Sequence, residues 1–390
     1  MPRALHILST LNPGGVERWL RDSVRQCGES SWRFDFCLLG RERGVYASEL
    51  EALGCRVLPC PLVPCVTFVA RLFALLRRER YDVVHSHVHH FSGLVLAVAR
   101  SAGVGVRAAH SHTCEPPGGP VGRRLYRRGM QELLERSMTV GFACSEQAAA
   151  FAGDIVRSRL RIVPCGIDLD AFRRKRPDGT KLRRQLGIPG DASVLGHVGR
   201  LAPEKNHLFL LRVAARLASQ VPRLRVVLVG GGPRDDLETL ARRLGLRRRI
   251  VFAGPRDDVP ELLGGVFDAL ALPSLREGLP AAVLEAQAAG LPCVVSEQTP
   301  AEAIVVPELV ERIGLGEGVE PWSAALVRAF ERQRWDRDDT CHLLRQRGFD
   351  VSTSFRRLTA AYEEMLDTRP AQAAVGPRLT GWGAHGRRAR

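Results

Sequence analysis

The sequence predicts an α/β protein with two doubly wound domains, and three observations support this prediction. The chain has 390 residues, enough for two domains of roughly 150 residues each. Short apolar runs alternate with longer helical patterns, which is typical of parallel sheets covered by helices on both faces. The alternation occurs twice, on either side of the polar segment 170–189. We therefore expect a first domain at 1–168, a linker with a short helix at 169–189 and a second domain at 190–350.

The first domain is expected to begin with an apolar strand at 3–9 and a helix at 15–27. Its further strands are predicted at 33–38, 55–58, 82–85, 106–110, 139–144 and 161–163, with an amphipathic helix at 66–80 and helices at 92–102 and 121–136. Strands of the second domain are predicted at 194–198, 224–229, 250–252, 269–272 and 293–295, with helices at 207–219, 235–244, 259–263 and 280–289. A last helix is expected at 351–366, before a disordered tail at 367–390. Ligands of such sheets bind at the carboxyl ends of the strands, so we expect a ligand in the cleft between the domains.

Composition narrows the function classes. The chain is 45% hydrophobic and 25% charged, which excludes a disordered chain, a coiled coil and a collagen-like fibre. A net charge of +15, carried almost entirely by arginine, indicates an anionic partner: nucleic acid, a phosphorylated metabolite or an anionic membrane. Neither a membrane span of about 20 apolar residues nor a signal peptide is visible. We therefore expect a cytosolic protein whose ten cysteines are reduced thiols.

Two loops carry residues that could bind a diphosphate. Gly14 and Gly15 open a helix after the first strand, where backbone N–H groups can approach an anion, although a tight turn would need the same glycines. Arg200 and Lys205 lie five residues apart in a strand-to-helix loop of the second domain. A guanidinium and an ammonium can converge on one pyrophosphate. The alternative is a solvated turn, and as loop charges both are expected to add less than about 1 kcal/mol to stability.

Two glutamates flank the start of the helix predicted at 280–289. Glu277 lies in the preceding loop and Glu285 lies inside the helix, so both can point into the cleft. Gly278 and Leu279 would bring backbone N–H groups to the same helix end, which favours an anion. A carboxylate can accept hydrogen bonds from two neighbouring sugar hydroxyls, so Glu277 suits a hexose and Glu285 suits a ribose. A surface position for Glu285 is disfavoured because its helix is largely apolar, and a buried glutamate requires a partner.

These motifs resemble those of the retaining glycosyltransferases of the large group 1 family, which have the two-domain, Rossmann-like GT-B fold. The resemblance covers about residues 3–366 and is strongest with bacterial exopolysaccharide and lipopolysaccharide enzymes. The segments that carry it are Gly14-Gly15-Val16-Glu17, Val163-Pro164-Cys165-Gly166-Ile167-Asp168, Gly199-Arg200 with Pro203-Glu204-Lys205-Asn206, Val229-Gly230-Gly231-Gly232-Pro233, and Glu277-Gly278-Leu279-Pro280 with Glu285.

The resemblance implies a nucleotide-diphosphate-sugar donor, expected to be a UDP-sugar, on the second domain and an acceptor on the first. It implies that Arg200 and Lys205 bind the diphosphate, that Glu285 holds the ribose and that Glu277 contacts the sugar hydroxyls. It also implies no cofactor and no catalytic metal, because the fixed cations replace the metal, and a C-terminal helix that crosses back to the first domain. The donor-binding residues so implied are Gly14, Gly15, Arg200, Lys205, Gly278, Leu279 and Glu285.

Histidines cluster after two predicted strands of the first domain. They are His85, His87, His89 and His90 after one strand, and His110 and His112 at the end of the other. Six histidines could bind zinc, but no acidic or cysteine ligand accompanies them at a regular spacing. The family has a histidine near the anomeric centre of the donor, and His112 matches it best. His112 and Glu277 are therefore the expected catalytic residues, while the segment 85–90 shapes the acceptor side or is structural.

We therefore expect a transferase that moves a sugar to an acceptor hydroxyl with retention of configuration. A lipid-linked acceptor or a growing cell-surface polysaccharide fits the resemblance best. A nucleotide-sugar epimerase on the same scaffold is an alternative, but the sequence shows no general acid/base pair for the hexose. A basic nucleic-acid-binding protein is another, although no binding module is recognisable, so no nucleic-acid partner is expected. The basic amphipathic helices predicted at 66–80 and 121–136 suit peripheral docking on the inner face of the cell membrane, or they are solvated faces.

Overall fold

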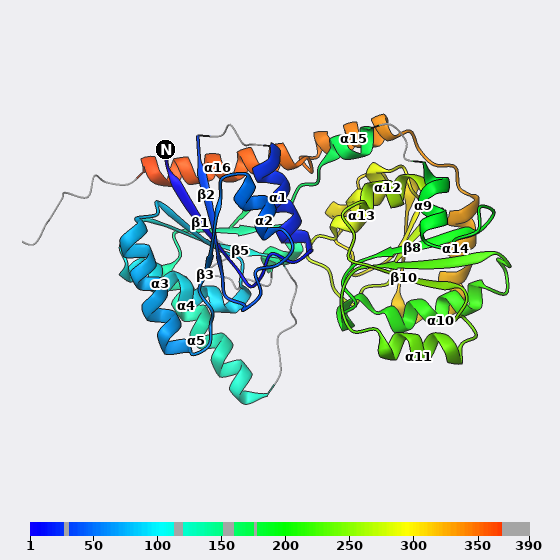
Figure 1. Ribbon diagram of the computed structural model, residues 1–390, viewed down its shortest axis with the longest axis horizontal. Coiled ribbons are helices and arrows are strands. Elements are labelled where there is room, and N and C mark those ends of the chain that lie inside the picture. The colour runs from blue at the N-terminus through cyan, green and yellow to red at the C-terminus, as the bar shows by residue number, and fades with distance from the viewer. Residues whose placement is uncertain (27–30, 113–119, 151–159, 175–177, 369–390) are drawn as a thin grey trace, which may run out of the picture.

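The computed structural model describes residues 1–26, 31–112, 120–150, 160–174 and 178–368. These residues form two α/β domains that lie side by side (Figure 1). Each domain is a parallel sheet with helices on both faces. The architecture confirms the prediction of two doubly wound domains.

The first sheet has seven parallel strands in the order β3-β2-β1-β4-β5-β6-β7. They are β1 (Arg3–Leu8), β2 (Arg33–Leu38), β3 (Arg56–Pro59), β4 (Val83–Ser86), β5 (Val106–Ser111), β6 (Val140–Ala143) and β7 (Leu160–Ile162). The helices are α1 (Gly15–Gln26), α2 (Ala47–Ala52), α3 (Cys65–Glu79), α4 (Ser92–Ser101), α5 (Val121–Ser137) and α6 (Glu146–Ala150). The central strands are buried along both faces, so they are mostly apolar, and the polar residues that they do carry, such as His6 and His85, are buried too.

The second sheet has six parallel strands in the order β10-β9-β8-β11-β12-β13. They are β8 (Ser193–Val198), β9 (Leu224–Val229), β10 (Ile250–Gly254), β11 (Ala269–Leu272), β12 (Cys293–Ser296) and β13 (Val310–Ile313). Their helices are α10 (His207–Leu217), α11 (Asp235–Arg243), α12 (Val259–Gly265), α13 (Ala281–Ala288), α14 (Val319–Glu331) and α15 (Arg337–Gln346). The sequence patterns had not indicated α2, α6, β13, α14 or α15.

The segment predicted as a linker is part of the second domain. It forms α8 (Leu169–Arg173) and α9 (Gly179–Gln185). Leu169 and Phe172 are buried in the core of that domain with residues of α12. The two apolar residues are not apparent within this mostly polar sequence. The segment 169–189 is therefore packed on the second domain and is not an unpacked linker.

The chain crosses between the domains at two places that lie against each other. Ile167 donates a backbone hydrogen bond to Phe349 O (2.8 Å) and accepts one from Val351 N (2.9 Å). After this crossing, α16 (Val351–Asp367) returns to the first domain and packs on α1 (Figure 1). This is the course predicted for the last helix. The tail predicted to be disordered lies outside the described residues from 369 onward.

Two further features of the described chain bear on the expectations. Seven described cysteines (Cys37, Cys55, Cys60, Cys144, Cys165, Cys293 and Cys341) are free thiols, and all are buried. Within the described ranges, no helix combines the length and the apolar character needed to cross a bilayer.

Candidate active site

The start of α1 in the first domain faces α13 of the second, and polar contacts join them directly. Arg18 Nη1 lies 2.9 Å from Glu285 Oε1, and Arg18 Nη2 donates to Arg256 O at 3.1 Å. Ser145 Oγ, which follows β6, donates to Gly278 O at 2.6 Å. The backbone before α13 and the carboxylate inside it are thus both tied to the first domain, and the predicted donor-binding residues lie at the domain interface.

Lys205 and Glu277 form the strongest contact among the predicted site residues. Lys205 ends the 3-10 turn η2 (Pro203–Lys205), and its Nζ lies 2.6 Å from Glu277 Oε1. The side chains are only 17% and 7% exposed. Leu275 N donates to Glu204 O at 2.8 Å, which holds the two loops together. The structure therefore places Lys205, which is predicted to bind the diphosphate, against Glu277, which is predicted to bind the sugar. The two residues are 72 positions apart in the sequence.

This contact corrects one expectation from the sequence. Lys205 is not a solvated loop charge, because it neutralises a buried carboxylate. Arg200 does fit that description: its side chain is 65% exposed and pairs at 3.0 Å with Glu204, four residues further along the loop. The two cations therefore differ in their contribution to stability, although the sequence presented them as equivalent.

A glycine-rich strand end holds the loop that carries Arg200. Gly230 has φ +144°, and a Cβ there would lie 2.0 Å from the backbone oxygen of Gly199. Gly232 has φ +137°, and its Cβ would lie 2.6 Å from the backbone oxygen of Leu201. Backbone hydrogen bonds of 2.9 and 2.7 Å join these two segments. Only glycine permits both the backbone conformation and the close approach.

The glycine loop of the first domain has a different constraint at each position. A Cβ on Gly14 would lie 2.2 Å from Glu17 Oε2, whereas a Cβ on Gly15 would meet nothing within 4 Å. Burial raises the pKa of Glu17, and the Arg200 charge across the interface lowers it in part. Gly14 therefore makes room for the side chain of Glu17, which interacts with the charge of Arg200, a residue predicted to bind phosphate.

Glu285 has the partner that its burial demanded, but the sequence did not identify that partner. Burial raises the pKa of the Glu285 carboxyl, and the guanidinium of Arg18 opposes this shift. Val283, Leu284 and Ala286 around it are fully buried. The only signal for Arg18 was its place in the first turn of the helix that follows Gly14 and Gly15. A pairing across 267 residues cannot be deduced from that position.

The structure gathers five imidazoles at the carboxyl end of the first sheet. They are His6, His85, His87, His110 and His112, whose neighbouring ring centroids lie 4.0–5.7 Å apart. His89 and His90 belong instead to the short turn η1 (His89–Phe91), whose residues are less buried. His6 was missed because a single histidine in an apolar strand carries no signal. Only the sheet order, with β1 beside β4, brings it to the others.

His112 lies at the end of a hydrogen-bonded chain of rings. Its Nε2 lies 2.9 Å from His87 Nδ1, and its Nδ1 lies 3.5 Å from the sulfur of Cys165. Burial lowers the pKa of His112, as does the neighbouring His110. Both ring nitrogens are engaged inside the first domain, so a bond to a donor requires the ring to exchange one of these contacts.

A cavity of about 550 Å³ lies beside the domain crossing, away from these residues. Charged side chains of α1, α8 and α15 and the N-cap residue of α16 line it, among them Asp22, Asp170, Arg345 and Asp350. None of the predicted site residues lines this cavity.

Known families match both halves of the chain. Residues 14–166 match the family described as "Glycosyl transferase 4-like domain", and residues 178–320 match "Glycosyl transferases group 1". The putative glycosyltransferase EpsF of Bacillus subtilis (strain 168) is 33% identical over 369 residues, which cover 92% of this chain and 96% of EpsF. The chain belongs to the group 1 glycosyltransferases.

Further relatives and solved structures agree with this assignment. An Escherichia coli enzyme named UDP-Gal:alpha-D-GlcNAc-diphosphoundecaprenol alpha-1,3-galactosyltransferase is 32% identical over 235 residues, 58% of this chain and 60% of its own. The crystal structure of Anabaena Alr3699/HepE in complex with UDP-glucose aligns with a TM-score of 0.77, at 22% identity over 93% of this chain and 99% of that one. WaaG, a glycosyltransferase involved in lipopolysaccharide biosynthesis, aligns with a TM-score of 0.72 at 17% identity, covering 92% and 99% of the two chains. The GT-B fold and the enzyme class are thereby confirmed.

Proposed function

We propose that this glycosyltransferase moves a sugar from a UDP-sugar to an acceptor hydroxyl with retention of configuration. The observation that carries the proposal is the Lys205–Glu277 contact before α13, which sets a cation beside a carboxylate that we propose binds the sugar. UDP is supported as the nucleotide because the E. coli relative is named for a UDP-sugar and the HepE structure contains UDP-glucose. The same relative is named for a diphosphoundecaprenol-linked acceptor, which supports a lipid-linked acceptor in cell-surface polysaccharide synthesis.

In this proposal the protein stabilises the charge that builds on the β-phosphate as the glycosidic bond breaks. An ammonium has three donors, so Lys205 can keep its bond to Glu277 and offer the others to phosphate oxygens. Arg200 must leave Glu204, which costs little because an exposed pair four residues apart is worth about 0.3–0.5 kcal/mol. The backbone N–H groups of Gly278 and Leu279 add donors at the end of α13. No metal is needed for this step.

The carboxylates have separate tasks in the proposal. Glu277 accepts hydroxyls of the transferred sugar while Lys205 holds it in place. Glu285 accepts hydrogen bonds from the ribose hydroxyls. For this, Arg18 either stays bound to one carboxylate oxygen and leaves the other open, or moves away from Glu285. His112 donates to the sugar or phosphate after exchanging its contact with His87 or Cys165. Gly14 and Gly15 let the first domain close over the phosphates.

A donor screen followed by a transfer assay tests the proposal. We expect UDP-sugars to raise Tm more than GDP- or ADP-sugars. Arg200→Ala should lower turnover by about 100- to 1,000-fold, as expected for a donor that acts in the transition state, while Glu204→Gln, the matched control, should leave turnover near wild type. Glu277→Gln should lower turnover but keep the affinity for UDP. The anomeric configuration of the product, read by NMR, should be that of the donor.

Three results would refute parts of this mechanism. Wild-type turnover in Arg200→Ala would remove the charge stabilisation by that loop. Activity lost in EDTA and restored by Mg²⁺ or Mn²⁺ would show that a metal stabilises the leaving group instead. An inverted product would exclude retention.

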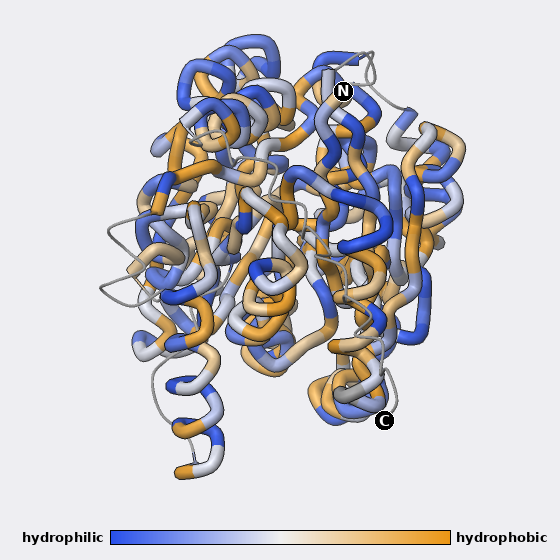
Figure 2. The backbone as a smooth tube through the Cα atoms, turned by 90° about the vertical axis from the view of Figure 1, so that its left-hand side faces the viewer, coloured by the Kyte–Doolittle hydropathy of each residue, from blue (hydrophilic) through white to orange (hydrophobic). Residues whose placement is uncertain are grey.

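We also propose that the first domain docks on an anionic membrane through α5. This helix projects from the domain (Figure 1), with hydrophilic and hydrophobic residues interleaved along its projecting part (Figure 2). Val121, Leu125 and Tyr126 are 61%, 66% and 46% exposed, next to exposed Arg123 and Arg124. Exposed apolar side chains beside arginines suit insertion among anionic headgroups. The helix α3 contributes less, since its apolar face, with Phe68, Leu72 and Leu76, is buried in the core.

Vesicle flotation tests this docking with the intact protein. Wild type should float with vesicles that contain phosphatidylglycerol and not with purely zwitterionic ones, and the double variant Val121→Ser/Leu125→Ser should lose most of the binding. The matched control Arg77→Gln/Arg78→Gln on α3 should bind as wild type. Equal flotation of all three proteins would remove α5 from the proposal.

A further inference from the structure

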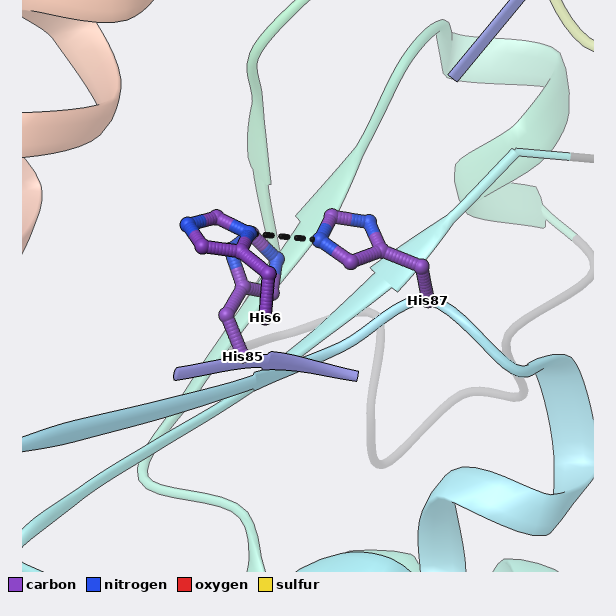
Figure 3. Close-up of side chains that lie close together, drawn as sticks. All are labelled: His6, His85 and His87. Carbon is purple, nitrogen blue, oxygen red and sulfur yellow. Dashed lines mark hydrogen bonds between the residues drawn. The ribbon is translucent and has the colours of Figure 1, made fainter. Parts of the chain in front are cut away.

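Three buried imidazoles meet where β1 and β4 end in the first domain (Figure 3). His6 on β1 lies directly beside His85 on β4 in the sheet register, and His87 follows one residue after β4 ends. Their residues are only 1%, 0% and 6% exposed. One nitrogen of each ring lies within 4.8 Å of a nitrogen of both others.

The hydrogen bonds of these rings leave two nitrogens unsatisfied. His6 Nδ1 lies 3.0 Å from His87 Nε2, and His85 Nδ1 bonds to the hydroxyl of Tyr362. His6 Nε2 and His85 Nε2 are buried and have no hydrogen-bond partner among the described residues. A buried polar atom without a partner is costly and calls for an explanation. An ion held by His6 Nδ1, His85 Nε2 and His87 Nε2 would give His85 Nε2 a partner, whereas His6 Nε2 would stay without one. Phenylalanine would fill the same space without this penalty.

We propose that His6, His85 and His87 bind one late first-row transition metal ion, with Zn²⁺ as the best match. A set of imidazole nitrogens suits zinc, copper or nickel and not magnesium or calcium. Two nitrogens bound to zinc at about 2.0–2.1 Å in a tetrahedral site lie about 3.3 Å apart, close to the 3.0 Å between His6 Nδ1 and His87 Nε2. Three histidines leave the fourth position to water.

The ion would also fix the proton positions of the ring chain that leads to the cleft. With His87 Nε2 on the metal, the ring proton of His87 must sit on Nδ1, which faces His112 Nε2 at 2.9 Å. His87 then donates and His112 Nε2 accepts, so neutral His112 carries its proton on Nδ1. The site is buried inside the first domain, and His87 links it to His112. It is separate from the phosphate-binding cations of the proposed function and takes no part in stabilising the leaving group.

Metal analysis of the untagged, full-length protein tests the proposal. Protein purified without chelators from cells grown in zinc-supplemented medium should contain about one zinc ion per chain, as measured by inductively coupled plasma mass spectrometry. After chelation, Zn²⁺ alone should raise Tm by a few degrees. His6→Phe keeps the aromatic contacts with Phe34 and Phe36 and should lose both the bound zinc and the Zn²⁺-induced rise.

The matched control is His207→Phe in the second domain. His207 is also buried and packs on another histidine, His197, with ring centroids 4.4 Å apart. Among the described residues, two groups of three histidines could hold an ion: His6, His85 and His87, and His87, His110 and His112. His207 belongs to neither. Its variant should keep the zinc content and the Tm response of wild type.

Several outcomes would overturn the proposal. Metal-free wild type whose Tm does not respond to Zn²⁺ would leave the rings as a hydrogen-bonded chain only. Zinc retained in His6→Phe, or lost in His110→Phe but not in His6→Phe, would place the ion elsewhere. If His6→Phe does not fold, the visible spectrum of the Co²⁺-loaded wild type decides, because sulfur-to-cobalt charge transfer would assign the ion to cysteines. All these readouts are independent of transfer activity.

Discussion

Removing the ammonium of Lys205 should destabilise the second domain as well as slow the reaction. Lys205 Nζ lies 2.6 Å from Glu277 Oε1, and the two side chains are 17% and 7% exposed. Lys205→Met keeps the aliphatic stem but withdraws this cation from a buried carboxylate. Breaking one partner of a buried pair costs about 3–5 kcal/mol. We expect a loss near the lower end, about 3 kcal/mol, because Lys205 keeps some contact with water.

The matched control is Arg200→Met in the same loop. Its side chain is 65% exposed and pairs with Glu204 four residues away. Such a pair is worth about 0.3–0.5 kcal/mol, so the control should unfold almost as wild type does. Arg200→Met and Lys205→Met should both slow transfer, and only the second should lower the free energy of unfolding strongly.

Urea unfolding of the nucleotide-free protein, followed by far-UV circular dichroism, measures both variants. The double variant Lys205→Met/Glu277→Gln removes both charges and should recover at least half of the loss, because no buried charge remains. A Lys205→Met protein within about 0.5 kcal/mol of Arg200→Met would show that the pair is effectively solvated. Additive losses in the double variant would show that the two side chains do not act as a pair.

Three further predictions follow from the geometry. Gly230→Ala should lower Tm and abolish UDP binding in calorimetry, because its Cβ would lie 2.0 Å from the backbone oxygen of Gly199, whereas Gly15→Ala, with open space beside it, should fold normally. Arg18→Met should remove the 2.9 Å contact with Glu285 and increase the radius of gyration of the ligand-free protein in X-ray scattering; an unchanged radius would mean that other contacts hold the domains. Burial lowers the pKa of His207 to about 4, so the unfolded chain binds a proton between pH 6.5 and 4 that the folded chain does not. The free energy of unfolding should therefore decrease by up to about 3 kcal/mol as the pH is lowered through this window. Urea titrations at pH 7.5 and 4.5 measure this decrease, and it should be smaller by that amount in His207→Gln.

The sequence predicted the elements with continuous apolar runs and missed several that are short or carry few apolar residues, and it also missed α14 despite its buried apolar face. The strand β13 (Val310–Ile313) lies at the sheet edge and carries two charged residues between its buried ends. Two residues, Leu169 and Phe172, anchor the segment that was expected to be a linker. In each case the tertiary position of one or two side chains decides the structure, and periodicity cannot report it.

The candidate site divides in the same way. The spacing of Glu277 and Glu285 and the loop of Lys205 were visible as local patterns. Their partners were not, because Arg18 reaches Glu285 across 267 residues. Local sequence can predict that a buried carboxylate needs a cation, but only the closed arrangement of the domains identifies which cation it is.

The paired crossings at Ile167 and Val351 make the second domain an insertion within the first. The core of the first domain includes Phe355, Leu358 and Tyr362 of α16, and Trp19 Nε1 of α1 donates to Ser354 Oγ at 2.8 Å. The first domain emerges from the ribosome first, but it cannot complete its core until α16, near the end of the chain, has been synthesised. The second domain can complete its core earlier. A premature stop codon shortly before α16 would accordingly damage the half of the protein that had been translated first.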